Sequence, residues 1–306
     1  MLNPVSPGAS AISNLFILTL VIAAFIFVLV AGLVIYIAIR FRQKPGQPDP
    51  RPVFGFRNLE IGWTVGPALI LLILFIFTVN VMGTSDPPVA QGSQPDITII
   101  GHQWWWEIHY PKLGVTTANE IHLPAGQPML AELRSADVIH DLWIPQVGRK
   151  MDMEPDQTNF LWLQAGTIGV YPGACAEYCG TEHARMLVSA IAQPQGDFTS
   201  WAKAQAAPAA APTGDLALRG QQVFQSKTCI NCHAINGTAA NAQVGPDLTH
   251  VASRNTLAAG TLPNTQDNLS AWIKDPQGIK PGSLMPNVQL TADELNALVA
   301  YMETLK

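Results

Sequence analysis

The sequence predicts a multidomain membrane protein that begins with a two-helix transmembrane hairpin and continues with a β-sandwich and a second soluble domain. Three observations carry this prediction: two long apolar runs near the amino terminus, a series of strand-like segments between turn residues, and an Ala/Pro-rich stretch that separates two soluble segments. The predicted boundaries are 1–90 for the amino-terminal tail and both spans, 91–195 for the sandwich, 196–215 for the linker and 216–306 for the last domain.

The two apolar runs are long enough to cross a lipid bilayer. They cover residues 15–39 and 61–81, and the first is interrupted only by Thr19 and Gly32. A helix of about 20 apolar residues spans the roughly 30 Å of hydrocarbon in a bilayer. A cleaved signal peptide is the alternative for the first run, but that run is too long and no basic segment precedes it. We therefore expect two spanning helices.

The distribution of basic residues predicts the orientation of the hairpin. The loop between the runs carries Arg40, Arg42, Lys44, Arg51 and Arg57. The amino-terminal flank carries none, and the next basic residue after the second run is Lys112. Because basic loops stay in the cytoplasm, we expect both termini and the soluble domains on the periplasmic side of a bacterial inner membrane, which the chain crosses more than once.

The first soluble segment has the pattern of a β-sandwich or barrel. DITIIGHQWWWEIHY, residues 96–110, is rich in β-branched and aromatic residues and is predicted as strand. Further strand-like runs are PMLAELRSA, NFLWLQAG and MLVSAIAQ, separated by Gly, Pro and Asp turns. Short strands at this spacing are typical of a sandwich of about 100 residues.

A metal-site pattern lies between two late strands. Cys175, Cys179, His183 and Met186 fall within twelve residues. Thiolate, imidazole and thioether are soft or borderline ligands and favour copper. A disulfide is the alternative for two cysteines outside the cytoplasm, and zinc is another, although methionine is a poor zinc ligand.

A second imidazole has to come from elsewhere in this domain. The best candidate is His140, which ends the strand-like run SADVIHDLWIP. The alternatives are His102, His109 and His122, which as lone histidines are more often structural.

The last segment contains CINCH, residues 229–233. Cys229 and Cys232 followed directly by His233 form the attachment signature of a c-type haem, in which the thiols bond to the vinyl groups and the imidazole binds iron. A thioredoxin-like cysteine pair would not need the histidine. A zinc site would need two further ligands, and all four cysteines of the chain are already assigned.

The sixth iron ligand should be a histidine or methionine further along the chain. The candidates are His250, Met285 and Met302. Met285 lies in the loop-like KPGSLMPN, whereas Met302 falls in a helix that opens with the capping box TADE. We expect Met285, because a methionine ligand raises the haem potential in a way that suits an electron carrier.

CAEYCGTEHARM resembles the binuclear copper (CuA) loop of cytochrome c oxidase subunit II, and DVIH and GHQWWW resemble the ligand strand and aromatic stretch of that family. The resemblance covers residues 12 to about 195. It implies a cupredoxin-like sandwich in which two bridging thiolates hold two coppers. The implied ligands are Cys175, Cys179, His140 and His183, with Met186 and the backbone carbonyl of Glu177 as weak axial ligands.

The same resemblance assigns three further roles. The Glu177 carboxylate would reach a magnesium ion at the interface with subunit I. Trp104, the first of three consecutive tryptophans, would be the electron entry residue. Glu60, in LEIGW, matches the entrance of a proton channel, although its position alone favours a solvated carboxylate that flanks a span.

Residues 216–306 resemble a class I bacterial cytochrome c, which implies an all-α domain. The matching positions are Gly220 and Phe224 in a first helix, Leu298 and Tyr301 in a last one, GPDL at 245–248 and Trp272. The whole chain thus resembles subunit II of a caa3-type cytochrome c oxidase, in which the donor cytochrome is fused to the copper subunit.

This resemblance implies a route for electrons. A periplasmic donor, either a cytochrome c or a respiratory complex, would reduce the haem, which passes electrons through CuA to subunit I. The oxidase reduces oxygen to water with proton translocation, and the implied partners are subunit I and subunit III. Neither predicted span carries a histidine, so the oxygen chemistry is expected in another polypeptide.

Three other functions remain open on the sequence. A CuA-containing nitric oxide reductase subunit would use the same route for a different acceptor. A quinol oxidase subunit would have this fold without the copper ligands. A membrane-tethered electron carrier would need only one anchoring helix. Nucleic acid binding is not expected, because the net charge is −5 and no long basic block occurs.

Overall fold

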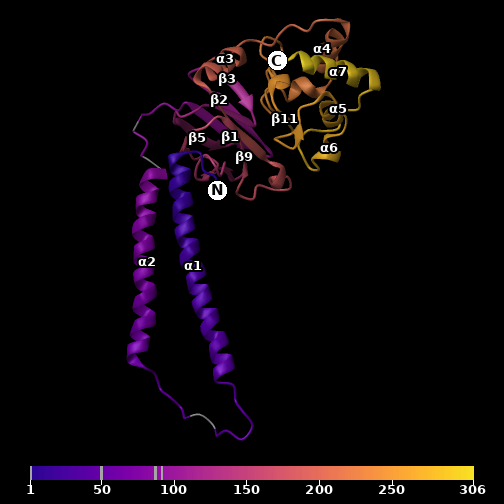
Figure 1. The fold of residues 1–306 in the computed structure, drawn as a ribbon. Coiled ribbons are helices and arrows are strands. Elements are labelled where there is room, and N and C mark those ends of the chain that lie inside the picture. Colours follow the sequence, from indigo (N-terminus) through magenta and orange to yellow (C-terminus); the bar gives the residue numbers. More distant parts are fainter. Residues whose placement is uncertain (1, 49–50, 86–87, 91) are drawn as a thin grey trace. The chain divides into compact units, whose positions relative to one another are not determined.

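The computed structural model describes residues 2–48, 51–85, 88–90 and 92–306 (Figure 1). The predicted domain boundary at residue 91 lies outside the described residues. The chain divides into two compact units. One comprises Ser10–Pro87, and the other comprises Met1–Ala9 together with Pro88–Lys306.

Both predicted spans are helical. α1 runs over Pro7–Arg40 and α2 over Arg57–Ser85. Their most apolar stretches are not buried within the protein, as expected of surface that lipid covers. Thr19 and Thr78 donate their hydroxyls to the carbonyls four residues earlier, so these polar groups are satisfied inside the helix, as hydrocarbon requires. Glu60 lies in the first turn of α2.

The copper-ligand domain is a sandwich of two five-stranded sheets. The first has the order β3-β2-β1-β5-β8, with β1 Ile97–His102, β2 Trp105–Tyr110, β3 Val115–Ala118, β5 Met129–Ser135 and β8 Asn159–Leu163. The second has the order β4-β10-β9-β6-β7, with β4 Glu120–Pro124, β6 His140–Trp143, β7 Met151–Met153, β9 Gly169–Cys175 and β10 Leu187–Gln193.

The sandwich core comes from alternate positions of the strands, because successive strand side chains point to opposite faces. In β2, Trp106, Ile108 and Tyr110 are fully buried. The copper-ligand candidates Cys175, Cys179 and Met186 belong to the same hydrophobic cluster. The metal-site pattern is therefore part of the domain core and does not lie on a surface loop.

The prediction of one strand over residues 96–110 is wrong. The segment forms β1 and β2, which pair antiparallel around a turn at Gln103 and Trp104. This turn contains no Gly, Pro, Asn or Asp, the residues that usually mark a turn. The high strand propensity of the tryptophans and isoleucines therefore concealed it.

Part of the predicted linker is also folded. Residues Gln195–Gln205 form helix α3, and its Phe198 and Ala202 are buried in the sandwich core. Trp201 stacks on the His122 ring with a centroid separation of 3.9 Å. The irregular chain between the domains is therefore shorter than the predicted 196–215 and covers residues 206–214.

The carboxyl-terminal domain is mainly helical, with α4 Asp215–Ser226, α5 Gln266–Lys274, α6 Pro276–Ile279 and α7 Ala292–Thr304. Three-residue or four-residue 3-10 turns and the two-residue strands β11 Thr256–Leu257 and β12 Leu262–Pro263 complete it. Helices α4 and α7 cross closely at Gly220, where a Cβ would overlap with the Ala297 carbonyl. The predicted capping box between Thr291 and Glu294 is confirmed at the start of α7.

Candidate metal centres

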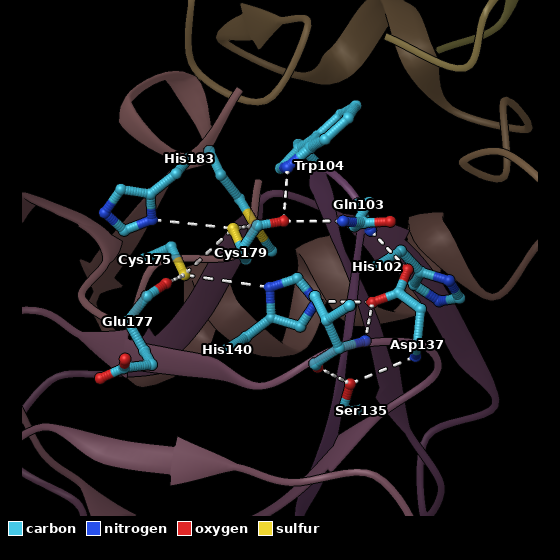
Figure 2. Close-up of polar contacts among 12 residues, drawn as sticks. His102, Gln103, Trp104, Ser135, Asp137, His140, Cys175, Glu177, Cys179 and His183 are labelled. Carbon is cyan, nitrogen blue, oxygen red and sulfur yellow. Dashed lines mark hydrogen bonds and ion pairs between the residues drawn. The ribbon is translucent and has the colours of Figure 1, made fainter. Parts of the chain in front are cut away.

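The copper-ligand candidates come from neighbouring strands of the second sheet and the loop between them. Cys175 ends β9, and the loop that carries Cys179 leads into the 3-10 turn His183–Arg185, followed by Met186. His140 begins β6, which pairs with β9 through Leu142 and Cys175. Strand pairing therefore brings His140 beside a loop that lies 35 residues further along the chain (Figure 2).

The donor atoms of these residues converge. The two cysteine sulfurs are 3.7 Å apart, and His140 Nδ1 lies 3.9 Å from Cys175 Sγ. On the other side, His183 Nδ1 is 3.7 Å and Met186 Sδ 3.8 Å from Cys179 Sγ. The Glu177 carbonyl oxygen lies 3.2 Å from Cys175 Sγ, while its side chain is exposed.

This donor set fits a soft metal pair. His140, Cys175 and Cys179 are all buried and offer ligand atoms within 4.8 Å of one another. The sulfurs are too far apart for a disulfide, which needs about 2.05 Å. The hydrogen bond between the two sulfurs lowers the pKa of Cys175 and raises the pKa of Cys179. A lowered thiol pKa favours the thiolate, which is the form that binds metals.

Asp137 orients His140 from behind. His140 Nε2 lies 2.8 Å from Asp137 Oδ1, and Asp137 is held in turn by the backbone N–H groups of Gln103 and Val138 at 2.7 and 2.6 Å. Burial alone would lower the pKa of His140, but its hydrogen bonds to Asp137 and Cys175 raise it. Such a carboxylate partner fixes the ring so that Nδ1 faces the metal.

The turn between β1 and β2 also contacts the copper loop. The Trp104 indole N–H donates to the Cys179 carbonyl at 3.0 Å, and the Gln103 amide donates to the same oxygen at 2.7 Å. Of the other two tryptophans, Trp106 is fully buried and Trp105 stacks on His102. Trp104 is therefore the tryptophan that touches the metal loop.

The other histidines of the sandwich have different partners. His102 and His109 hold the two carboxylate oxygens of Glu107, each at 2.9 Å. Burial of Glu107 raises its pKa, but these hydrogen bonds outweigh burial and lower it to about 2. His122 is stacked on Trp201 of α3. None of these three histidines joins the cysteine pair among the described residues.

The haem-attachment motif follows α4. Cys229 lies in the 3-10 turn Thr228–Asn231, and Cys232 directly follows that turn. His233 Nδ1 lies 2.7 Å from the Pro246 carbonyl, so Nδ1–H donates there and Nε2 is the atom left for iron. A Cβ at Gly245 would come within 2.6 Å of the His233 ring, so this glycine leaves the space that the imidazole needs.

The three candidates for the sixth iron ligand differ in their burial and in their hydrogen-bond partners. His250 is buried, with Nδ1 2.6 Å from the Lys306 carbonyl and Nε2 3.0 Å from the Ala207 carbonyl. Met302 is buried in the helical core. Met285 lies in the loop after α6, half-buried, and its carbonyl accepts from Gln277. Both competitors of Met285 thus have structural roles.

Two residues at the copper site were missed in the sequence. Asp137, three residues before His140, and Gln103, beside Trp104, both contact the site directly. The spacing of Asp137 to His140 was the available signal, since metal-binding histidines commonly pair with a carboxylate. Gln103 carries no such signal, because its contact depends on the unpredicted turn.

Three family models match this chain. Residues 1–81 match "Cytochrome C oxidase subunit II, transmembrane domain", residues 113–192 match "Cytochrome C oxidase subunit II, periplasmic domain", and residues 217–306 match "Cytochrome c". The three matches follow the order of the hairpin, the sandwich and the helical domain described above.

Individual proteins are also similar. Cytochrome c oxidase subunit 2 of Alkalihalophilus pseudofirmus is 37% identical, over 100% of this chain and 90% of the relative. The Bacillus subtilis protein of the same name is 34% identical, over 89% of this chain and 82% of the relative. The crystal structure of the periplasmic domain of the Bradyrhizobium japonicum oxidase subunit II is 29% identical, with a TM-score of 0.35, over 37% of this chain and 95% of that one. This chain is a membrane-anchored subunit of an oxidoreductase and belongs to the subunit II family of cytochrome c oxidases, with a cytochrome c domain at its carboxyl end.

Proposed function

We propose that this chain is the electron-entry subunit of a caa3-type cytochrome c oxidase. A covalent haem c accepts electrons from a periplasmic donor, and a binuclear CuA centre passes them to a haem-copper subunit I that reduces oxygen to water. The observation that carries the proposal is the convergence of five side chains from β6, β9 and the loop before β10. Their donors are the two thiolates of Cys175 and Cys179, the imidazoles of His140 and His183, and the thioether of Met186.

The protein prepares this site for electron transfer and not for bond chemistry. The thiolates of Cys175 and Cys179 would hold the coppers, and a centre of this kind would spread the charge of one electron over several atoms, so that little nuclear movement would accompany reduction. Cys179 and Met186 are buried, which keeps water away and lets the surrounding groups tune the potential. The ring of His140 is held by Asp137, which would limit its movement when the charge at the site changes.

The haem site completes the relay. We assign Cys229 and Cys232 to the thioether bonds, His233 to iron and Met285 to the sixth position. The accommodation of the His233 ring by Gly245 supports this assignment, as does the structural use of His250 and Met302. A closed six-coordinate haem transfers electrons and does not bind substrate.

Other parts of the proposal concern partners and protons. The exposed Glu177 carboxylate is assigned to a magnesium ion at the interface with subunit I. Glu60, in the first turn of α2, is assigned to the entrance of a proton path, and Trp104 to electron entry into copper. The basic loop that contains Arg40 and Arg57 supports a periplasmic location of the soluble domains. Subunit III is a further expected partner.

Spectroscopy of the full-length protein tests the proposal. The haem-loaded chain should show a low-spin c-type spectrum and a mixed-valence copper resonance, with two coppers per chain by metal analysis. His183→Ala should abolish the copper signal, whereas His109→Ala, in the same domain, should retain it. A haem-loaded, folded protein without copper after reconstitution would exclude the assignment. Oxygen uptake by the complex with its large subunit then separates an oxidase from a nitric oxide reductase.

A further inference from the structure

The haem-attachment domain and the sandwich belong to one compact unit, and hydrogen bonds cross between them. The Leu187 N–H donates to the Ala259 carbonyl at 3.1 Å, and the Arg185 guanidinium donates to the Ile279 carbonyl at 2.8 Å. Leu187 and Arg185 flank the copper-ligand candidate Met186. Ile279 begins the stretch that leads to Met285. The two candidate metal sites are therefore joined by the segments that carry their ligands.

Lys280 is a buried charge at this junction. Its residue is 3% exposed, and its ammonium donates to the carbonyls of Trp104 at 2.8 Å, Arg185 at 2.9 Å and Ala258 at 3.3 Å. An ammonium group has three donors, so these carbonyls use all of them. Two acceptors belong to the sandwich and one to the domain of Lys280 itself.

We propose that Lys280 is a positioning residue that locks the cytochrome c domain onto the copper loop in one orientation. This rests on the proposed function, because it specifies how haem and copper are held for transfer. Trp104 and Arg185 each adjoin a copper-ligand candidate. The Trp104 indole donates to the Cys179 carbonyl, and Arg185 directly precedes Met186 in the chain. A single side chain thus fixes the Met285 loop against both.

A second buried charge acts at the same junction from the opposite side. Glu120, in β4, is 2% exposed. Its Oε1 accepts from the backbone N–H groups of Asn255 and Thr256 at 2.8 and 2.9 Å, and from the Thr256 hydroxyl at 3.1 Å. Each domain therefore inserts one charged side chain into backbone groups of the other.

Buried charges specify orientation better than they add stability. A charge removed from water costs several kcal/mol unless hydrogen bonds replace its hydration. The partners of Lys280 and Glu120 at the junction are backbone groups, together with the Asn255 and Thr256 side chains. An arrangement that kept both charges buried but moved them away from these partners would carry that cost. Segment 206–214 therefore connects two domains that have one defined docked arrangement. A flexible tether alone would raise the local concentration of the two domains without requiring such an arrangement.

The first test measures docking by amide hydrogen exchange on the full-length, detergent-solubilised protein. The Leu187 amide is the reporter, because its acceptor Ala259 lies in the other domain. In Lys280→Met the protection of this amide should fall about tenfold, as expected when the hydrogen bonds of a charged group are lost. The exposed Lys274, changed to Met, is the matched control and should leave protection unchanged.

Optical and copper resonance spectra of Lys280→Met should match the unchanged protein, which separates positioning from unfolding. The second test combines Lys280→Met with Glu120→Gln and follows electron transfer from haem to copper after flash photoreduction. We expect slower transfer in the double variant with unchanged spectra. Unchanged Leu187 protection in Lys280→Met, or an unchanged transfer rate in the double variant, overturns the proposal. Absence of haem-to-copper transfer in the unmodified protein would instead reject the proposed function. The hydrogen-exchange measurement on Leu187 would then decide the role of Lys280 by itself.

Discussion

The two candidate metal sites differ in how they relate to the core of their own domain. His140, Cys175, Cys179 and Met186 are all buried and belong to or pack within the sandwich core. In contrast, Cys229, Cys232, His233 and Met285 are half-buried. The sandwich thus forms its candidate site from its own strands and the loop between them, whereas the helical domain presents its candidate haem ligands at partly exposed positions, which a bound haem would cover.

Removal of the haem should therefore have the largest effect, and only on one domain. In Cys229→Ser with Cys232→Ser, we expect loss of covalent haem and loss of cooperative unfolding in residues 216–306, because a small domain has a small core, to which a bound haem would add apolar contacts. The copper resonance should persist. Haem content and domain-resolved hydrogen exchange check this. Parallel collapse of the sandwich would contradict the contrast between the sites.

A small substitution should disable the copper site. A Cβ at Gly101 would lie 2.7 Å from Cδ2 of the His140 ring. Since Gly101 is in β1, paired on both sides, the strand cannot move away. We expect Gly101→Ala to weaken copper binding about 10–100-fold, as other disturbances of ligand orientation do. Metal titration measures the change. Gly196→Ala, at an exposed position of α3 where a Cβ meets no atom within 4 Å, controls for the loss of a glycine.

The equivalent change in the haem domain should be milder. A Cβ at Gly245 would lie 2.6 Å from the His233 ring, but this glycine lies in an irregular segment that is not held by strands on both sides. We expect Gly245→Ala to keep covalent haem and lose only part of its low-spin spectrum. Optical spectroscopy over a range of temperatures measures the loss. Complete loss of the low-spin form would show that this loop is as rigid as β1.

The smallest expected effect concerns acid stability of the sandwich. The pKa of Glu107 falls from 4.5 to about 2, since its hydrogen bonds to His102 and His109 outweigh burial. Its contribution is therefore complete above pH 4.5 and is lost as the pH falls toward 2. Glu107→Gln should lower the free energy of unfolding at neutral pH by about 1 kcal/mol and flatten its pH dependence in that window. Denaturant titrations at several pH values measure both, and an unchanged slope would contradict the assignment.

Whether a feature of this molecule can be predicted from the sequence depends on how far apart in the chain its interacting residues lie. The hairpin, the helix cap at Thr291 and the clustering of Cys175 to Met186 follow from local patterns, because spans, caps and short metal loops are defined by nearby residues. Two other features do not follow from local patterns. The turn at Gln103 lacks the usual turn residues, and the folding of 195–205 as α3 depends on the packing of Phe198 against the sandwich. Lys280 could not be found at all, because its partners lie up to 176 residues away.

The buried Lys280 also has an energetic consequence. Burial lowers its pKa to about 8, so the ammonium is still charged at neutral pH, and it lies within electrostatic reach of Cys179. An electron that arrives at the cysteine pair adds negative charge there, which a nearby cation stabilises. Under the proposed function, docking would therefore make the copper side the better electron acceptor, and the driving force for transfer would depend on whether the two domains are in contact.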